Sequence, residues 1–317
     1  MYFPYVRGRQ YELLALRELV TNNLLNNLVT PIVEPVKLSS TLVNMMEVYI
    51  NANHPVSIIR NPIVGTFLSD CQDAHKMSKE AGYKQRFSEQ YKNPVIIKSL
   101  IMQKNAKSSL DCWAKHGINK SDLLVINVDR DYLDLYVSEF GTVNPYYVLM
   151  PDESAFRRKV RQNRVLLDDK FAKQARNADY KNSEDEFFSD DHLYYKDDGF
   201  IGFSDYSVIG NEYLESGFAP YAVAIHIVYF AKDKTLRVRH FVSDSNDDIT
   251  NPALKFYEAV SKLAQWCNAG PNPVEMTLGL KTFLHHYEQQ SYPGLGTVKK
   301  LSLMHHLELM GKYLSEG

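Results

Sequence analysis

Short, continuously apolar segments that alternate with helical segments constrain the fold of this chain most strongly. They are rich in Val and Ile and are bounded by turn-forming residues, which is typical of strands buried on both faces. The segments are TPIVEPVK (30–37), VSIIR (56–60), PVIIKSLIM (94–102), DLLVINV (122–128) and PYYVLM (145–150). Helical patterns separate them, near 11–25, 40–50, 67–92, 105–116 and 130–140, and a further helix begins at 152. The alternation predicts a parallel sheet.

The second half of the chain departs from this rhythm. Residues 168–198 are polar and acid-rich without a clear period, and we expect an acidic loop or flap there. GFIGFSDYSVIG (199–210) offers a further strand, and residues 221–230 and 236–244 predict a hairpin. A C-terminal helical portion (252–317) then follows, with helices predicted near 252–267, 273–290 and 297–314.

Two architectures accommodate five or more βα units. One is an α/β, (β/α)-barrel-like fold, irregular in its second half and followed by the C-terminal helices; the other is an open doubly wound sheet. We favour the barrel, because no first βα turn carries a GxGxxG or P-loop sequence. No linker or internal repeat marks a boundary, so we predict a single barrel-like domain over residues 1–317. The sequence points to no particular cofactor.

Charge balance and cysteine content restrict the partners and the compartment. The net charge is -2 at pH 7, so no whole-molecule field draws the chain to nucleic acid or to an anionic membrane. Cys71, Cys112 and Cys267 are far apart and odd in number, which argues against a disulfide framework. No apolar stretch approaches the roughly 18 residues of a membrane span. We therefore expect a cytoplasmic protein.

Polar residues gather where the predicted strands end. In either architecture, ligands bind beyond the carboxyl ends of the parallel strands. An arginine fork holds phosphate or carboxylate groups, and a carboxylate near Lys or His transfers protons. We predict Glu34, Asp205 and His240 as catalytic groups. The predicted ligand-binding residues are Lys37, Arg60, Asn61, Asp129 and Arg130.

Some of the strand-end charges have a structural explanation. Asp152 and Glu153 fit the first turn of a helix, where acidic side chains are stabilised. Glu34 and Lys98 each interrupt an apolar run in which an unpaired charge is costly. An ion pair between Glu34 and Lys98 across neighbouring strands is therefore the structural alternative for both.

Histidine pairs on the last two predicted helices raise the question of a metal site. The sequences are HHYE (285–288) and HHLE (305–308). A His and a Glu three residues apart share a helix face, so two such helices could enclose a metal. The order is reversed relative to the Glu-x-x-His of di-metal bundles, and no further bridging carboxylate is evident. We assign no metal ligands, and a metal-dependent enzyme using these histidines is the weakest alternative.

Four segments carry a resemblance to a known group of proteins. MYFPYVRGRQYELLAL (1–16) followed by PIVEPVK (31–37) resembles the beginning of the bacterial and phage proteins called the Beta family. GFSDYSVIG (202–210) and RHFVSDSNDD (239–248) are similar to stretches of its bacterial members. The resemblance implies a bacterial, phage or mobile-element source and a role in phage–host conflict, but it assigns no catalytic residue. The polar residues of these segments to test first are Arg7, Arg9, Glu12, Glu34, Lys37, Asp205, His240 and Asp244.

The leading functional hypothesis is a strand-end pocket that binds a phosphate-bearing or other anionic ligand. If the protein is an enzyme, hydrolysis or phosphoryl chemistry fits these residues best, with Arg60 and Arg130 holding the anion. The main alternative is a non-enzymatic interaction protein of a phage-defence or mobile-element module. In that case residues 168–198 would contact a protein partner.

Overall fold

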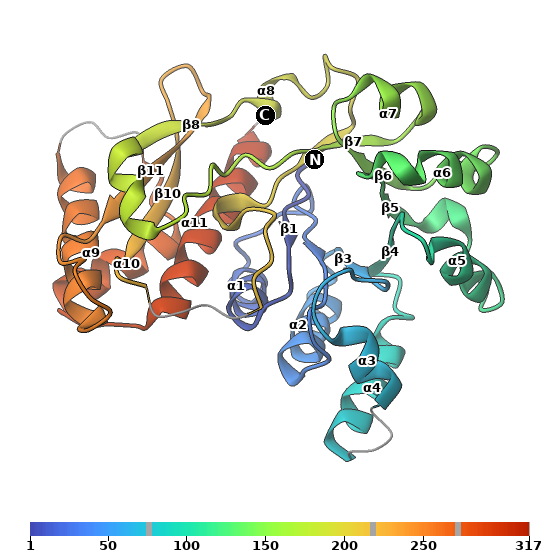
Figure 1. The fold of residues 1–317 in the computed structure, drawn as a ribbon, viewed down its shortest axis with the longest axis horizontal. Helices are drawn as coiled ribbons and strands as arrows, with labels where there is room; N and C mark the ends of the chain where they lie inside the picture. The colour runs from blue at the N-terminus through green and yellow to red at the C-terminus, as the bar shows by residue number, and fades with distance from the viewer. Residues whose placement is uncertain (74–77, 216–219, 270–273, 317) are drawn as a thin grey trace. The chain divides into compact units, whose positions relative to one another are not determined.

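A computed structural model describes residues 1–73, 78–215, 220–269 and 274–316 (Figure 1). The chain divides into two compact units. Unit 1 comprises Met1–Leu13, Asn26–Asp168 and Tyr194–Asp205, and unit 2 comprises Leu14–Leu25, Asp169–Leu193 and Tyr206–Gly317. Both units draw on distant parts of the sequence. A boundary between domains is usually recognised in the sequence as a flexible linker. Because each unit is built from three separate segments, the sequence contains no single linker that divides them.

An eight-stranded parallel sheet in the order β1-β2-β3-β4-β5-β6-β7-β9 forms the centre of unit 1. Its strands are β1 (Tyr5–Val6), β2 (Ile32–Val33), β3 (Val56–Ile59), β4 (Ile96–Ile101), β5 (Leu124–Ile126), β6 (Tyr147–Met150), β7 (Arg164–Leu167) and β9 (Gly202–Ser204). The last strand returns to the first, because Tyr2 bridges Phe203 and the Tyr5 N–H donates to the Asp205 carbonyl (2.9 Å). The sheet is thus a nearly closed barrel. The barrel prediction is confirmed, and the open doubly wound alternative is wrong.

Helices connect the strands of unit 1, as a βα barrel requires. They are α1 (Gln10–Thr21, which runs on into unit 2), α2 (Ser40–Asn51), α3 (Phe67–Asp73), α4 (Ser78–Gln90), α5 (Ala106–Ala114), α6 (Leu133–Phe140) and α7 (Ser154–Lys159), with 3-10 turns η2 (Lys120–Asp122) and η3 (Arg130–Tyr132). The helix predicted over 67–92 is described as α3 and α4, and residues 74–77 between them lie outside the described residues.

Strand registers decide which side chains face the barrel interior. The hydroxyls of Ser57 on β3 and Ser99 on β4 are buried and hydrogen-bond each other. Lys98 precedes Ser99 and points to the opposite face, where its Nζ donates to the Asn93 carbonyl (2.9 Å). The predicted Glu34–Lys98 ion pair is therefore wrong, because the alternation along β4 turns Lys98 towards the helices.

The sheet of unit 2 is antiparallel, in the order β10-β11-β8. Its strands are β8 (Asp185–Ser189), β10 (Ala224–Phe230) and β11 (Leu236–Val242). The pairing of β10 with β11 confirms the predicted hairpin. β8 lies within residues 168–198, so the expectation of an acidic flap is wrong for this part. Asp185 and Glu186 open β8 and bind Arg237 (2.6 Å) and His240 (3.0 Å) of β11, so the acidic residues that suggested a loop serve strand pairing.

Helices complete unit 2 and agree closely with the prediction. They are α9 (Pro252–Asn268), α10 (Leu278–Glu288) and α11 (Leu295–Glu316), with η4 (Asn177–Ser183), η5 (Ser207–Ile209) and the short α8 (Asp191–Tyr194), which ends in unit 1. A Cβ on Gly279 of α10 would lie 2.4 Å from the Leu301 carbonyl of α11, so these helices meet backbone to backbone. None of the helices in the described parts of the chain combines the length and apolarity needed to cross a membrane.

A comparison of two glycines of unit 1 distinguishes the cost of a strained backbone conformation from the cost of a steric clash. Gly65 and Gly117 both have φ of +74°, but only at Gly65 would a Cβ collide with backbone, 2.1 Å from the Val36 carbonyl. We expect Gly65→Ala to lower the free energy of unfolding by about 2–5 kcal/mol and Gly117→Ala by about 1–2 kcal/mol. Urea denaturation measures both losses. Equal losses would show that contact with Val36 plays no part in the requirement for glycine.

Candidate functional site

A buried carboxylate lies at the carboxyl end of β2, among donors from neighbouring strands. Glu34 is fully buried, and the Tyr5 hydroxyl donates to its Oε2 (2.7 Å). The Arg7 guanidinium forms an ion pair with the same oxygen, and the Ile63 N–H donates to Oε1 (2.8 Å). These donors come from the ends of β1 and β3, which flank β2. The arrangement keeps an ionised side chain in a region where an unpaired charge would be strongly destabilising.

The local sequence explains how β1 presents these groups. Tyr5 and Arg7 are two residues apart, so they share a face of an extended strand. Gly8 follows with φ of +62°, and a Cβ there would lie 2.9 Å from the Glu34 carbonyl. Glycine therefore lets the chain turn close against β2 and enter α1.

A second buried acid follows on α1. Glu12 is buried, and its Oε2 accepts the Arg9 N–H (3.4 Å), as the third residue of a helix does in a capping box. Burial raises the pKa of Glu12, although the Arg9 N–H and the positive charges of Arg9 and Arg7 oppose that shift. A carboxyl with a raised pKa at the carboxyl edge of a barrel is a candidate for proton transfer.

Two asparagines at this edge differ in their partners. Asn61, predicted as a ligand-binding residue, has its amide occupied: Nδ2 donates to the Ile101 carbonyl (2.8 Å) and Oδ1 accepts the Ile101 N–H (2.9 Å). It therefore joins β3 to β4. Asn127, which follows β5, is fully buried, and neither of its side-chain polar atoms has a partner among the described residues. Such a group marks a place for a bound water or ligand.

The structure does not bring Arg60 or Asp205 to Glu34. The Arg60 guanidinium lies 5.7 Å from the ring of Phe67 and 5.8 Å from that of Phe87, on the helix side of the sheet. Asp205 accepts a hydrogen bond from the Tyr2 hydroxyl (2.8 Å). Each residue ends a strand as predicted, but strand alternation points it away from the barrel interior.

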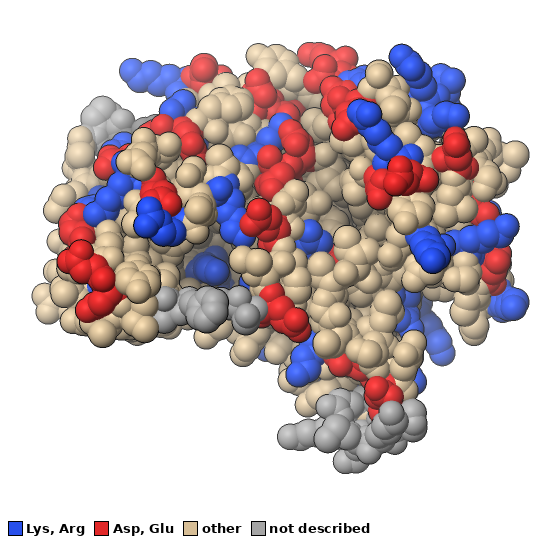
Figure 2. Space-filling view, in the orientation of Figure 1, with Lys and Arg blue, Asp and Glu red and all other residues tan. Residues whose placement is uncertain are grey.

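The remaining predicted ligand-binding residues of unit 1 are exposed. Lys37 lies in the loop after β2. Asp129 caps η3 by accepting the Asp131 N–H (3.0 Å), and Arg130 pairs with Glu153 (2.5 Å) at 69% side-chain exposure. An exposed pair of this kind contributes about 0–1 kcal/mol. Figure 2 shows Lys and Arg interspersed with Asp and Glu over the face of the molecule that it presents.

His240 belongs to unit 2, where it forms part of a buried cluster on the sheet. Its Nε2 bonds to Glu186 Oε1 (3.0 Å), and its Nδ1 lies 2.7 Å from Nδ1 of His226 on β10. Burial lowers the pKa of both imidazoles, although the Glu186 carboxylate opposes the shift at His240. The rings of Phe171 and Tyr180 pack against the pair.

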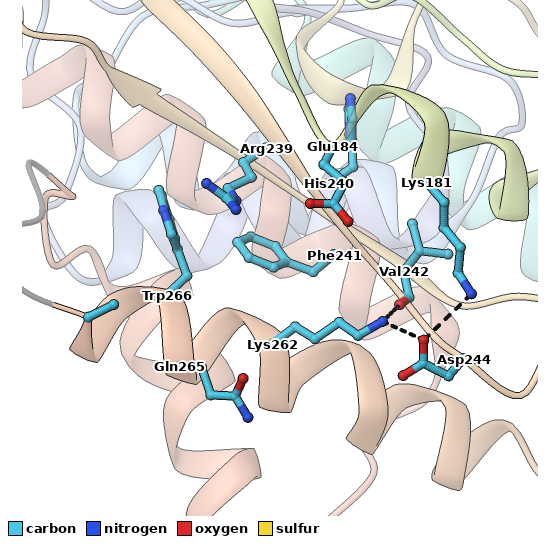
Figure 3. A pocket seen from close by; sticks show the side chains of 11 residues that line it. Lys181, Glu184, Arg239, His240, Phe241, Val242, Asp244, Lys262, Gln265 and Trp266 are labelled. Atoms are coloured by element: carbon cyan, nitrogen blue, oxygen red, sulfur yellow. Dashed lines mark hydrogen bonds and ion pairs between the residues drawn. The ribbon is translucent and has the colours of Figure 1, made fainter.

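The other face of the same sheet forms a pocket with α9 that encloses about 460 Å³ (Figure 3). Lys262 Nζ donates to the Val242 carbonyl (2.6 Å) and to Asp244 (2.7 Å), and its charge lowers the pKa of Asp244. The Arg239 guanidinium lies 5.5 Å from the Trp266 ring, and both side chains line the pocket. Asp244, one of the two acids that line this pocket, is therefore already paired with both of its lysines, Lys262 and Lys181.

The C-terminal histidines do not converge on a metal site. His305 bonds to Thr277 Oγ1 (2.7 Å) and to the Val228 carbonyl (2.6 Å), and His306 Nδ1 bonds to Ser207 Oγ (2.8 Å). Among the described residues, no group of three His, Cys, Asp or Glu side chains is placed to hold a metal ion. The described residues therefore give no support to the metal alternative, and His305 and His306 have polar partners within the core of unit 2.

Some residues of these clusters were not assigned as site residues from the sequence, although the signal was present. Tyr5 precedes Arg7 by two residues and so shares its face. The predicted hairpin places His226 directly opposite His240, as the observed register does. For Glu186, by contrast, the sequence gave no indication of a place in the cluster, because β8 was not predicted as a strand.

Comparisons with known proteins add little to this description. No family model and no curated protein matches the chain. Among solved structures, the chain is similar to the spore cortex-lytic enzyme SleL of Bacillus cereus, with 9% sequence identity and a TM-score of 0.32 over 97% of this chain and 74% of that one. A TM-score this low supports no conclusion about fold or activity.

The buried histidines of α11 predict a loss of stability in acid. Burial lowers the pKa of His305 to about 4 and that of His306 to about 3. The unfolded chain takes up these protons near pH 6.5, so the stabilisation that the neutral rings provide is complete above that pH. It is lost as the pH falls towards 4 for His305 and towards 3 for His306. We expect the urea concentration at the midpoint of unfolding to fall across this pH window.

His306→Asn, which keeps a hydrogen-bonding group near Ser207 but cannot titrate, should reduce that fall in the midpoint. An unchanged pH dependence would contradict this assignment.

Proposed function

We propose that the carboxyl edge of the unit 1 barrel binds an anionic ligand that carries a phosphate or carboxylate group. The observation that carries the proposal is the Glu34 cluster, in which an arginine is fixed by a buried carboxylate at the edge where barrel proteins hold their ligands. The guanidinium of Arg7 has five N–H groups, and its side chain retains 11% exposure. Its positive charge is therefore held beside Glu34 and also acts at the partly exposed edge of the barrel, where it favours an anion.

Preorganisation is the reason that Arg7 suits this role. Binding is weakened by the loss of side-chain freedom, and an arginine already held by Glu34 loses little more. Lys37 follows Glu34 in the same loop and is exposed, so it supplies a second positive charge that can move towards the ligand. We assign Arg7 the orienting contact and Lys37 the more general electrostatic one.

Hydrolysis is the reaction that we propose for this edge. Glu12 is buried, and burial raises its pKa, which moves it towards the range in which a carboxyl exchanges protons near neutral pH. The charges of Arg7 and Arg9 act on Glu12, so an anion held by Arg7 would be near the proton-transfer group. Glu34 has three donors, and we assign it the positioning of Arg7 in place of the catalytic role predicted from the sequence.

Isothermal titration calorimetry with pyrophosphate, at low salt, tests the anion site. We expect Arg7→Lys to weaken binding by roughly 10-fold or more, because the planar fork is lost while the charge remains. Lys37→Met should weaken binding by roughly 2-fold to 5-fold, which corresponds to one exposed charge. Lys115→Met, an identical change at an exposed residue beyond α5, is the matched control and should leave binding unchanged.

Two outcomes would overturn the proposal. One is the absence of pyrophosphate binding by the parent chain, and the other is equal affinity in the Arg7→Lys, Lys37→Met and Lys115→Met proteins.

A second experiment, the release of 4-nitrophenol from 4-nitrophenyl phosphate, tests hydrolysis separately from binding. Glu12→Gln should abolish release and leave pyrophosphate affinity unchanged if Glu12 transfers the proton.

A protein partner is the second function that we propose, because β8 lies at an edge of its sheet and exposes an aromatic ring. Phe187 is 53% exposed, and β8 pairs only with β11 in the described sheet. Edge strands with an apolar side chain accept an added strand from a partner. Phe187→Ser should remove a partner captured from a bacterial lysate, whereas Leu254→Ser, an exposed control on α9, should not. Identical capture by both variants would end this proposal.

The cellular setting stays a proposal as well. Cys71, Cys112 and Cys267 are all free thiols, which fits a reducing compartment such as the cytoplasm. Membership of the Beta family would add a role in conflict between bacteria and phages. Its support is the resemblance of the segments that contain Arg7, Glu12 and Glu34.

A further inference from the structure

Three side chains on the unit 2 sheet form a continuous hydrogen-bonded chain. His226 and His240 are directly opposite each other on β10 and β11, and their Nδ1 atoms are 2.7 Å apart. The Nε2 atom of His240 lies 3.0 Å from Glu186 Oε1 on β8. All three strands of the sheet therefore contribute one member each.

The chemistry of these groups fixes where the protons lie. A carboxylate only accepts hydrogen bonds, so His240 carries its proton on Nε2 and donates it to Glu186. Burial favours neutral imidazoles, which leaves Nδ1 of His240 as an acceptor. His226 must then carry its proton on Nδ1 and donate it to His240. Nε2 of His226 is left with a lone pair.

Burial separates the roles of the two histidines. The His240 side chain is fully buried, whereas His226 is partly exposed. Nδ1 of His226 bonds to His240, and Nε2 is not among the buried atoms that lack a partner in the described parts of the chain. The hydrogen-bonded chain therefore ends at the Nε2 atom of the partly exposed His226. The rings of Phe171 (5.1 Å) and Tyr180 (4.6 Å) flank the His226 ring and hold its orientation.

We infer that His226 is the reacting base of a proton-transfer site on this face of the unit 2 sheet, with a hydroxyl-bearing molecule or water as its substrate. His240 is a positioning residue, and Glu186 stabilises the charge that develops on it. The site is distinct from the anion site proposed for unit 1 and does not depend on it.

The proton transfer balances within the three residues. Nε2 of His226 takes the proton of a substrate O–H group, and the Nδ1 proton of His226 passes to Nδ1 of His240. His226 thus stays neutral, the substrate oxygen becomes an anion, and His240 becomes an imidazolium beside the Glu186 carboxylate. A carboxylate that backs an imidazole in this way stabilises the cation formed during the reaction.

The charged groups around His226 favour its neutral, basic form. Burial lowers its pKa most, and the neighbouring His240 and Lys299 of α11 lower it further. Glu186 reaches His226 only through His240 and raises the pKa of that second ring. His226 is therefore unprotonated at neutral pH, as a general base must be.

Diethyl pyrocarbonate tests this inference without knowledge of the natural substrate, because it acylates neutral, accessible imidazoles. The Nε2 lone pair of His226 attacks a carbonyl of the reagent, ethyl carbonate leaves, and the Nδ1 proton passes to His240. Peptide mass spectrometry measures the acylation rate of each histidine in the folded protein. The exposed His116, which follows α5 in unit 1, is the internal reference.

We expect His226 to be acylated at a rate that His240→Phe lowers by roughly tenfold, because the Nδ1 proton of His226 then has no acceptor and about 1.4 kcal/mol of driving force is lost. Glu186→Gln, a milder change at a residue with 24% side-chain exposure, should lower the rate in the same direction. The rate at His116 should be unchanged in both variants, and far-UV circular dichroism confirms folding.

Two results would overturn the inference. If His116 is acylated while His226 is not, the Nε2 atom is not accessible and cannot act on a substrate. If His226 reacts equally fast in the parent, His240→Phe and Glu186→Gln proteins, the hydrogen-bonded chain does not act on its reactivity. Long-range proton–nitrogen spectra give an independent readout, since the inferred arrangement requires the proton of His226 on Nδ1.

Discussion

The carboxylate of Glu34 is the interaction on which the carboxyl edge of the barrel depends. It is fully buried, and a buried ion is tolerated only when its charge and lone pairs are satisfied. Tyr5 and Arg7 at the end of β1 and the Ile63 N–H beyond β3 together satisfy it. Because the carboxylate and its donors together belong to three neighbouring strands, the carboxylate fixes the loops that follow β1, β2 and β3. Removal of one partner of such a buried pair costs about 3–5 kcal/mol in general.

Close backbone packing gives this corner of unit 1 its shape. Gly8 and Gly65 adopt positive φ values where a side chain would collide with the chain after β2. The Thr66 N–H donates to the Val36 carbonyl (2.7 Å), which holds the loop after β3 against the loop after β2. The polar groups of the edge are thus held by backbone contacts as well as by the ion pair, which is the rigidity that a binding site needs.

Unit 2 uses the same principle on a different scaffold. Its strand β8 is short and begins with two acids, yet it is ordered because Arg237 and His240 of β11 bind those acids. His240, which binds Glu186 of β8, also hydrogen-bonds to His226 of β10. The same side chain therefore holds β8 to β11 and connects the two histidines. On α11, His305 is instead hydrogen-bonded to a hydroxyl and a carbonyl group, and Nδ1 of His306 is hydrogen-bonded to a hydroxyl group. Among the described residues, no metal-binding group includes them.

The sequence by itself determined the parallel strands of the barrel, the hairpin and the C-terminal helices, because hydrophobic periodicity survives without knowledge of contacts. It also identified Glu34, since a charge inside an apolar run needs a partner. β1, β7 and β8 were not predicted from the sequence; β8 begins with Asp185 and Glu186, two acids that suggested a loop. The tertiary structure alone decided which partner Glu34 takes, which way Arg60 and Asp205 point, and how two units share one chain. Those outcomes follow from strand register and the alternation of side chains, and register is set by long-range pairing that no local pattern contains.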